Sequence, residues 1–396
     1  MHNETQYCDL SKKLTKSISR EQKKSNGIFF TPPQTVQECI EKVCPYLPPF
    51  LKILEPSCGS GEFIIPMLKC FPHSSITGIE FNITIYESIK DKYPNIINDD
   101  FLKYTPKNPS SFDLIIGNPP YYVMKKNSVD KKYDPYYDGR PNIFILFIIK
   151  CLSLLSPNGI LCFVLPNNFL NCIYYEKTRS YILKNFTIIN IFEPEGSYIE
   201  TQQNTIVLIV KNEKTQTSSE FATTVGSNKT IIFGTKQGII DINNLINNTT
   251  TLTNLGFNVY VGKTVWNQNK NILTDDTSQT RLIYSSDIKN NSVVIETYKN
   301  PEKKNYIEKN GNTGKILLVN RGYGTGEYKF DFCLYESQHP YLIENHLICI
   351  SGPDNGSYEK IVKSFNDERT IKFINIYFSN NTINTYELAN ILPIYI

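Results

Sequence analysis

Hydrophobic and polar positions follow two alternating patterns in the first half of the chain. Short apolar runs, typical of buried strands, occur at residues 51–54, 76–79, 112–116, 160–164, 188–191 and 206–210. Segments of helical length or spacing occur at residues 31–44, 63–70, 84–92, 142–155 and 174–185. Thr31 is expected to cap the first of these helices. Strands that alternate with helices predict an α/β fold, in which a doubly wound parallel sheet carries helices on both faces.

The pattern changes after residue 211. Residues 212–229 are polar and predict a surface linker. Short apolar runs, Gly and Asn turns and no clear helical spacing follow, so we expect a second domain at 221–396 with a mixed α+β fold, after a first domain at 27–220. Residues 1–26 are polar and basic. We expect them to be a solvated or frayed segment, with an arm that contacts DNA as the less favoured alternative.

Composition limits the classes of protein to which the chain can belong. It has 396 residues, of which 40% are hydrophobic and 20% charged, so it can bury sizeable cores. The net charge of +3 neither requires nor excludes a nucleic-acid partner. No signal peptide is visible and the apolar run at 143–149 is too short to cross a membrane, which predicts a cytoplasmic protein. The ten cysteines lack metal or disulfide spacing, so we expect reduced cysteines and no metal site.

Polar residues gather where the predicted strands end, which is where a doubly wound sheet binds ligands. Glu55 precedes a tight Gly-containing turn that is neither a Walker loop nor a full GxGxxG motif. Glu80 stands where such folds bind ribose hydroxyls, and Asp100 with Phe101 suits a purine amine and ring. Asn118 ends the next strand. Each feature alone also fits a structural role, such as a cap or a solvated loop, but their order on successive strands indicates a nucleoside ligand.

This order resembles the gamma-class, TaqI-like DNA adenine-N6 methyltransferases that depend on S-adenosylmethionine. The matching segments are "GIFFTPPQTV", "ILEPSCGSGEF", "GIEFN", "NDDFL" and "FDLIIGNPPYYV". The resemblance covers residues 27–211 well and is looser beyond them. It implies a Rossmann-like catalytic domain at 27–220 and a DNA target-recognition domain at 221–396. It also implies S-adenosyl-L-methionine as cofactor, S-adenosyl-L-homocysteine as product, and action as a monomer on double-stranded DNA, with any cognate restriction endonuclease acting separately.

Individual roles follow from the same resemblance. The implied cofactor-binding residues are Thr31, Glu55, Pro56, Cys58, Gly59, Gly61, Glu80, Phe81, Asp100, Phe101, Asn118 and Pro120. The implied catalytic loop is Asn118, Pro119, Pro120 and Tyr121, whose carbonyl oxygens would accept the two N–H groups of an exocyclic amine. Tyr121 would stack on a base extruded from the duplex. Tyr198 is the best match for a second wall, and an ordinary loop tyrosine is the alternative.

Residues that contact DNA are the least defined by the sequence. The candidates are Lys125, Lys126, Lys263, Trp266, Arg321 and Tyr323. A plain exposed loop at 125–140, a core tryptophan and a hairpin turn near residue 323 are the competing interpretations.

The sequence leaves three other functions open. An RNA or protein-glutamine methyltransferase would use the same Asn-Pro-Pro-Tyr chemistry. A restriction enzyme that cuts DNA would use a metal site, and Asp287 with Glu302 and Lys304 loosely fits such a spacing. A DNA-binding protein without activity is disfavoured by the intact motifs.

Overall fold

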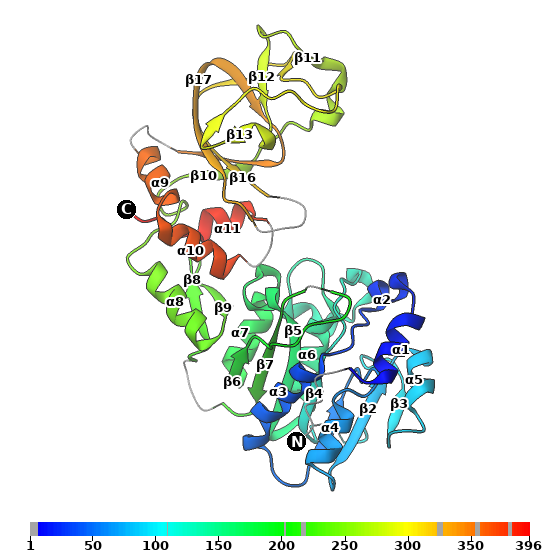
Figure 1. Cartoon of the computed structure of the whole chain (residues 1–396). Helices are drawn as coiled ribbons and strands as arrows, with labels where there is room; N and C mark the ends of the chain where they lie inside the picture. The colour runs from blue at the N-terminus through cyan, green and yellow to red at the C-terminus, as the bar shows by residue number, and fades with distance from the viewer. Residues whose placement is uncertain are drawn as a thin grey trace. The chain divides into compact units, whose positions relative to one another are not determined.

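The computed structural model describes residues 7–108, 110–201, 203–214, 219–322, 328–352, 357–378 and 382–396. It divides the chain into two compact units (Figure 1). Unit 1 comprises the described residues of Met1–Thr223 and Ile231–Ile239, and unit 2 those of Thr224–Thr230 and Ile240–Ile396. Among these residues no helix is long and apolar enough to cross a membrane.

Unit 1 is built on a seven-stranded sheet with the order β3-β2-β1-β4-β5-β7-β6. The strands are β1 (Lys52–Glu55), β2 (Ser75–Glu80), β3 (Ile96–Asn98), β4 (Phe112–Gly117), β5 (Leu155–Pro166), β6 (Thr187–Phe192) and β7 (Thr205–Lys211). All neighbours pair in parallel except β7, which is antiparallel to both β5 and β6. The predicted Rossmann-like fold is therefore confirmed, and β3 is a short strand that the hydrophobic pattern did not reveal.

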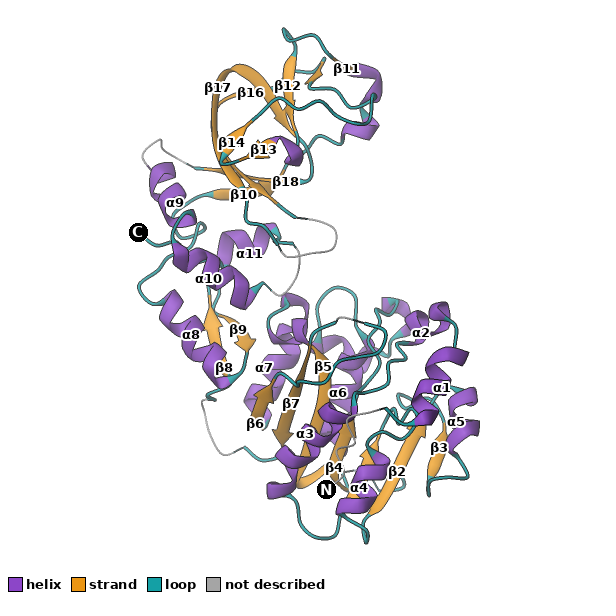
Figure 2. Ribbon diagram, viewed as in Figure 1, coloured by secondary structure: helices purple, strands orange, loops and turns teal. Residues whose placement is uncertain are grey.

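Helices cover both faces of this sheet (Figure 2). They are α1 (Asp9–Ser17), α2 (Arg20–Asn26), α3 (Pro33–Val43), α4 (Ile64–Cys70), α5 (Ile83–Ile89), α6 (Ile143–Leu154) and α7 (Glu176–Asn185). Side chains of β4 alternate between two cores, as the pleat of a strand requires. Leu114 and Ile116 pack in one core with α3 and α4, and Ile115 packs in the other with α6. Because both faces are covered, most residues of the central strands are apolar on both faces.

Two expectations about the ends of unit 1 are wrong. The described part of residues 1–26 is not a frayed segment, because α1 and α2 bury Ser11, Leu14 and Ile18 against the unit. Leu14 and Ile18 share a small apolar core with Phe30. Nor do residues 212–229 form only a linker. Within them lies β8 (Ala222–Val225), which pairs with β9 (Thr230–Phe233) in a two-stranded sheet, and α8 (Lys236–Ile246) follows.

Unit 2 contains a second seven-stranded sheet with the order β10-β18-β16-β17-β12-β15-β11. Its strands are β10 (Asn258–Val261), β11 (Leu273–Thr274), β12 (Thr280–Ile283), β15 (Tyr306–Ile307), β16 (Asn312–Asn320), β17 (Phe332–Ile343) and β18 (Leu347–Ser351). The pairing is antiparallel except between β12 and β17. A small hairpin of β13 (Ile288–Lys289) and β14 (Ser292–Val293) lies beside β17 in the views of Figures 1 and 2.

Helices α9 (Ser357–Phe365), α10 (Glu368–Tyr377) and α11 (Thr385–Asn390) also belong to unit 2. The sequence showed no clear helical spacing there, yet α10 buries Thr370, Phe373, Ile374 and Tyr377, a regular i, i+3, i+4, i+7 stripe. Aromatic and β-branched residues build this stripe, so local composition suggests strands more than helices.

Candidate active site

A pocket opens beyond the carboxyl ends of β1, β2 and β4 in unit 1. Its empty volume, the open mouth included, is about 1020 Å³. The predicted cofactor residues that line it are Thr31, Glu55, Pro56, Gly59, Glu80, Phe81, Asp100, Phe101, Asn118 and Pro120. The sequence thus located the pocket, although it missed several lining residues, which include Asn26, Gly27, Ser57, Glu62, Tyr122 and Met124.

Cys58 and Gly61 were expected to line the pocket, but neither does. They instead hold the conformation of the Gly-containing turn that follows Glu55. The Cys58 side chain is buried, and its backbone N–H donates to the carbonyl oxygen of Ile79 at 2.9 Å. Gly61 has a φ of +87°, and a Cβ there would lie 2.6 Å from the Tyr93 ring. The turn therefore needs a glycine for its backbone conformation and for space.

Glu80 is fixed by the turn that it faces. Its carboxylate accepts the backbone N–H of Gly59 at 2.9 Å and that of Asn82 at 2.7 Å. Burial raises the pKa of Glu80 to about 7, although these backbone N–H groups work in the opposite direction. Each carboxylate oxygen keeps a further lone pair, so Glu80 could accept two hydroxyl groups of a ligand at once.

Two more carboxyl groups face the same pocket. Glu55 is buried, and its Oε2 atom has no hydrogen-bond partner. Desolvation, followed by the charges of Glu62 and Glu80, raises the pKa of Glu55 well above its ordinary value. Glu62 accepts a hydrogen bond of 2.7 Å from Ser11 Oγ and another from Ser60. Because an unpaired buried carboxylate is costly, this end of the pocket suits a cationic ligand group.

The other end of the pocket offers apolar surface beside an acid. Phe101 is buried, with its ring centroid 4.8 Å from that of Phe147, whereas the side chain of Phe81 is 68% exposed. Asp100 Oδ1 accepts the N–H of Leu102 at 3.0 Å. This arrangement could hold a flat heterocycle with an amino group.

Asn118 lines the pocket and directly precedes Pro119 and Pro120. Its Nδ2 donates to Thr31 Oγ1 at 3.1 Å and to the Tyr198 hydroxyl at 3.3 Å. Its Oδ1 accepts the hydroxyl of Tyr121 at 2.5 Å. Thr31 is thus a partner of Asn118 and not the helix cap expected from the sequence, since α3 begins at Pro33 with Pro32 at its N-cap and no side-chain cap bond. The Tyr198 hydroxyl thus contacts Asn118, and the predicted roles of both residues stay predictions.

The loop of Asn118 to Tyr121 also contacts Gly27, Phe144 and Val164. Gly27 has a φ of +64°, and a Cβ there would lie 2.7 Å from Tyr121 N and 2.9 Å from Pro120 Cβ. The Tyr121 ring packs edge-on against Phe144 at 5.9 Å. Its hydroxyl oxygen also lies 2.8 Å from the carbonyl oxygen of Val164, so its one hydrogen is shared between Val164 and Asn118. The tight approach of Gly27 and the two hydroxyl contacts of Tyr121 were not foreseen.

The residues expected to contact DNA are spread over both units. Lys125 and Lys126 are exposed after the loop, and Lys263 and Arg321 are exposed in unit 2. Tyr323 lies outside the described residues. Trp266 is half-buried against a cluster of Leu282, Tyr284 and Ile307. The core interpretation of Trp266 therefore has direct structural support, and the DNA contacts stay predictions.

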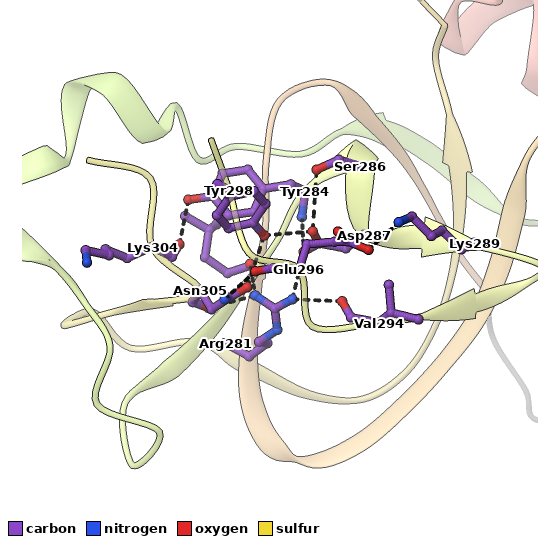
Figure 3. A network of polar contacts seen from close by, with 11 residues as sticks. Arg281, Tyr284, Ser286, Asp287, Lys289, Val294, Glu296, Tyr298, Lys304 and Asn305 are labelled. Atoms are coloured by element: carbon purple, nitrogen blue, oxygen red, sulfur yellow. Dashed lines mark hydrogen bonds and ion pairs between the residues drawn. The ribbon is translucent and has the colours of Figure 1, made fainter. Parts of the chain in front are cut away.

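The spacing that suggested a metal nuclease does not form a site. Asp287 is fully buried and pairs with Arg281 at 2.7 Å, while Tyr298 donates to its other oxygen (Figure 3). Glu302 and Lys304 form exposed ion pairs elsewhere, with Lys270 and Asp275 respectively. Within the described part of the chain no group of three or more His, Cys, Asp or Glu residues could hold a metal ion. Asp287 is a structural residue of unit 2.

Comparison with known proteins agrees with this geometry. Residues 69–199 match the family model of the Eco57I restriction-modification methylase. Type II methyltransferase M.CvrRI of Paramecium bursaria Chlorella virus XZ-6E is 30% identical over 385 residues, which cover 95% of this chain and 96% of that protein. The chain belongs to the type II methyltransferase family. The expected use of S-adenosylmethionine is confirmed with it, whereas the gamma subclass stays a prediction.

Two further matches extend over both units. Modification methylase CviBIII of Paramecium bursaria Chlorella virus NC1A is 29% identical over 411 residues, which span 99% of this chain and all of that protein. The structure of the type IIL restriction-modification enzyme MmeI in complex with DNA is 10% identical, with a TM-score of 0.55 over 98% of this chain and 70% of that chain. This likeness shows a shared fold for the type II methyltransferase described here.

Proposed function

We propose that the protein transfers a methyl group from S-adenosylmethionine to the N6 amine of an adenine within a short, specific sequence of double-stranded DNA. The observation that carries this proposal is the position of Asn118, which lines the pocket and directly precedes the proline loop. An amide oxygen at that place can accept hydrogen bonds from an exocyclic amine while the methyl donor lies beside it.

Binding of the cofactor is assigned to the three carboxyl groups and the apolar end of the pocket. S-adenosylmethionine supplies the methyl group from its sulfonium centre and leaves as S-adenosyl-L-homocysteine. The free Oε2 of Glu55 suits the positive charge of its methionine part. Glu80 accepts the ribose hydroxyls, and Asp100 with Phe101 holds the adenine ring. Glu55 thus recognises the methionine part of the cofactor, and Glu80 recognises its ribose.

Asn118 and the loop then activate the target. The lone pair of an adenine N6 is delocalised into the ring, which makes it a poor nucleophile. Asn118 Oδ1 and the backbone carbonyl of Pro119 accept its two N–H groups, so the nitrogen pyramidalises and its lone pair localises for in-line attack. With the cofactor bound, the N–CH₃ bond would form as the S–CH₃ bond breaks, and the amine proton would then pass to solvent water. Pro119 and Pro120 keep the loop stiff.

The target base must leave the helix to reach this loop. Tyr121 and Tyr198 are proposed to form the walls of its pocket, since both side chains contact Asn118. Unit 2 is proposed as the target-recognition domain, with Lys263, Trp266, Arg321 and Tyr323 as candidate contacts, and Lys125 and Lys126 as phosphate contacts beside the loop. The enzyme is proposed to act as a cytoplasmic monomer, separately from any cognate restriction endonuclease.

A methyl-transfer assay tests the proposal. Labelled cofactor is incubated with duplex DNA, RNA and protein in separate reactions, and the modified nucleosides of the DNA are identified. We expect N6-methyladenine in duplex DNA only. Label in RNA or in protein glutamine would favour the alternative methyltransferases. Methylation-aware sequencing of DNA from cells that express the protein then gives the recognised sequence.

A further inference from the structure

The N-terminal helices of unit 1 contact the site at two separate places. At the cofactor pocket, Ser11 of α1 donates its hydroxyl to Glu62. At the target side, Lys23 of α2 forms an ion pair of 2.7 Å with Glu200, in the segment at 193–201 that also carries Tyr198. The second contact has no part in the function proposed above.

Lys23 is an unusual lysine because its side chain is only 7% exposed. Lysine is almost never buried unless it is paired. Its ammonium group donates to Glu200 Oε1 and to the backbone carbonyl oxygen of Thr15. The ammonium position is therefore fixed by α1 and α2, and Glu200 is bound to a rigid support.

The described residues 193–201, to which Glu200 belongs, form no helix or strand. Other contacts hold Gly196 and Ser197 of this segment close to Thr35 and Tyr7. The Tyr7 hydroxyl donates to the carbonyl oxygen of Ser197 at 3.1 Å, and a Cβ on Gly196 would lie 2.3 Å from Thr35 Oγ1. Lys23 is the cation that holds the end of the segment, two residues beyond Tyr198.

We propose that Lys23 is a positioning residue for methyl transfer, which acts through Glu200 on Tyr198. The Tyr198 hydroxyl accepts the Nδ2–H of Asn118 at 3.3 Å, so Tyr198, together with Thr31 and Tyr121, sets the orientation of the Asn118 amide. The amide oxygen must point at the target amine, and Tyr198 must lie beside the base. This inference rests on the proposed function, because it assigns Asn118 and Tyr198 to the reaction.

Lys23→Met tests the inference, because methionine keeps the buried stem and removes only the ammonium group. We expect kcat to fall by about 10- to 100-fold, the cost of a small misplacement in a preorganised site. The dissociation constants of cofactor and duplex DNA should stay as in the wild type. Lys16→Met, the same change at an exposed position of α1, is the control and should leave kcat unchanged.

A double-mutant cycle shows whether the effect passes through Tyr198. In a Tyr198→Phe background, Lys23→Met should lower kcat much less than in the wild type, because the hydroxyl that it positions is already gone. Glu200→Gln should reproduce the fall in kcat. Additive effects in the cycle would overturn the inference. A joint loss of thermal stability and cofactor affinity in both Lys23→Met and Glu200→Gln would also overturn it, because the pair would then be merely structural.

The two proposals fail in different ways. If the wild type does not methylate adenine in duplex DNA, the proposed function is wrong, and the role of Lys23 falls with it. If the wild type does methylate adenine and Lys23→Met keeps its kcat, only the positioning role is wrong.

Discussion

The hydroxyl of Tyr121 donates a hydrogen bond of 2.5 Å to the side-chain oxygen of Asn118. This is the same oxygen that we propose as an acceptor for the target amine. A carbonyl oxygen has two lone pairs, so Tyr121 either shares it with the base or leaves it when the base arrives. In both cases the hydroxyl, together with Thr31 and Tyr198 at the amide nitrogen, sets the orientation of the amide before the base binds.

Tyr121→Phe should therefore be impaired, although it keeps the ring. One hydrogen bond is worth about 0.5–1.5 kcal/mol, which corresponds to roughly a 2- to 10-fold fall in the rate of methyl transfer. Tyr121→Ala should fall further, because stacking on a base is worth about 1–3 kcal/mol more. Single-turnover transfer to duplex DNA measures both. Tyr46→Phe, at a half-exposed side chain that is not among the described pocket-lining residues, is the control. A fully active Tyr121→Phe would show that the ring alone matters.

Asn118→Ala should abolish methyl transfer, since no other side-chain carbonyl replaces Oδ1 at that position. Cofactor affinity should change little, because Thr31 and the three carboxyl groups of the pocket remain. Calorimetric titration with S-adenosyl-L-homocysteine, together with the transfer assay, separates the two effects. A variant that still methylates would remove Asn118 from the mechanism.

The sequence predicted the sheet of unit 1 well, because its central strands are apolar on both faces and end in recognisable polar turns. It predicted the pocket for the same reason, since parallel strands bring their carboxyl ends to one edge. Contacts between distant segments were beyond its reach. The packing of Ser11 against Glu62 and the pairing of Lys23 with Glu200 join residues far apart in the chain. No local pattern encodes such pairs.

Unit 2 shows a different limit. Its strands β11, β13, β14 and β15 have two residues each, too few to display an alternating pattern. The spacing of Asp287, Glu302 and Lys304 suggested a metal site, yet each of these side chains forms an ion pair with a different residue. Spacing between charged residues carries little information when the elements between them are so short.

Glu80→Gln should remove part of the pH dependence of cofactor binding. The pKa of Glu80 is raised by burial from 4.5 to about 7. Ribose hydroxyls donate to the ionised form, so affinity should rise as the pH increases from 5.5 to 8. Without ligand the sign is opposite: the raised pKa stabilises the fold below pH 4.5, and this stabilisation is lost as the pH rises through 7.

Titrations with S-adenosyl-L-homocysteine across this range measure the dependence. The wild type should gain affinity toward a plateau above pH 7, and Glu80→Gln should bind more weakly at pH 8 with a flatter profile. Some dependence should persist, because burial also raises the pKa values of Glu55 and Glu62. Identical profiles for both proteins would contradict the assignment of Glu80 to the ribose.

Asp287→Asn should destabilise unit 2 without touching the cofactor site. The substitution keeps the shape of the side chain but leaves Arg281, itself 5% exposed, as an uncompensated buried charge. Breaking such a pair costs about 3–5 kcal/mol. Asp275→Asn breaks an exposed pair with Lys304 and should cost about 1 kcal/mol or less.

Trp266 is the sole tryptophan of the chain and packs in the cluster of Tyr284, so its fluorescence during urea unfolding reports on this unit. The midpoint should fall clearly for Asp287→Asn and barely for Asp275→Asn, while both variants bind the cofactor normally. Equal midpoints would show that Asp287 and Arg281 are not a structural pair, and a selective loss of cofactor affinity in Asp287→Asn would tie this carboxylate to the reaction after all.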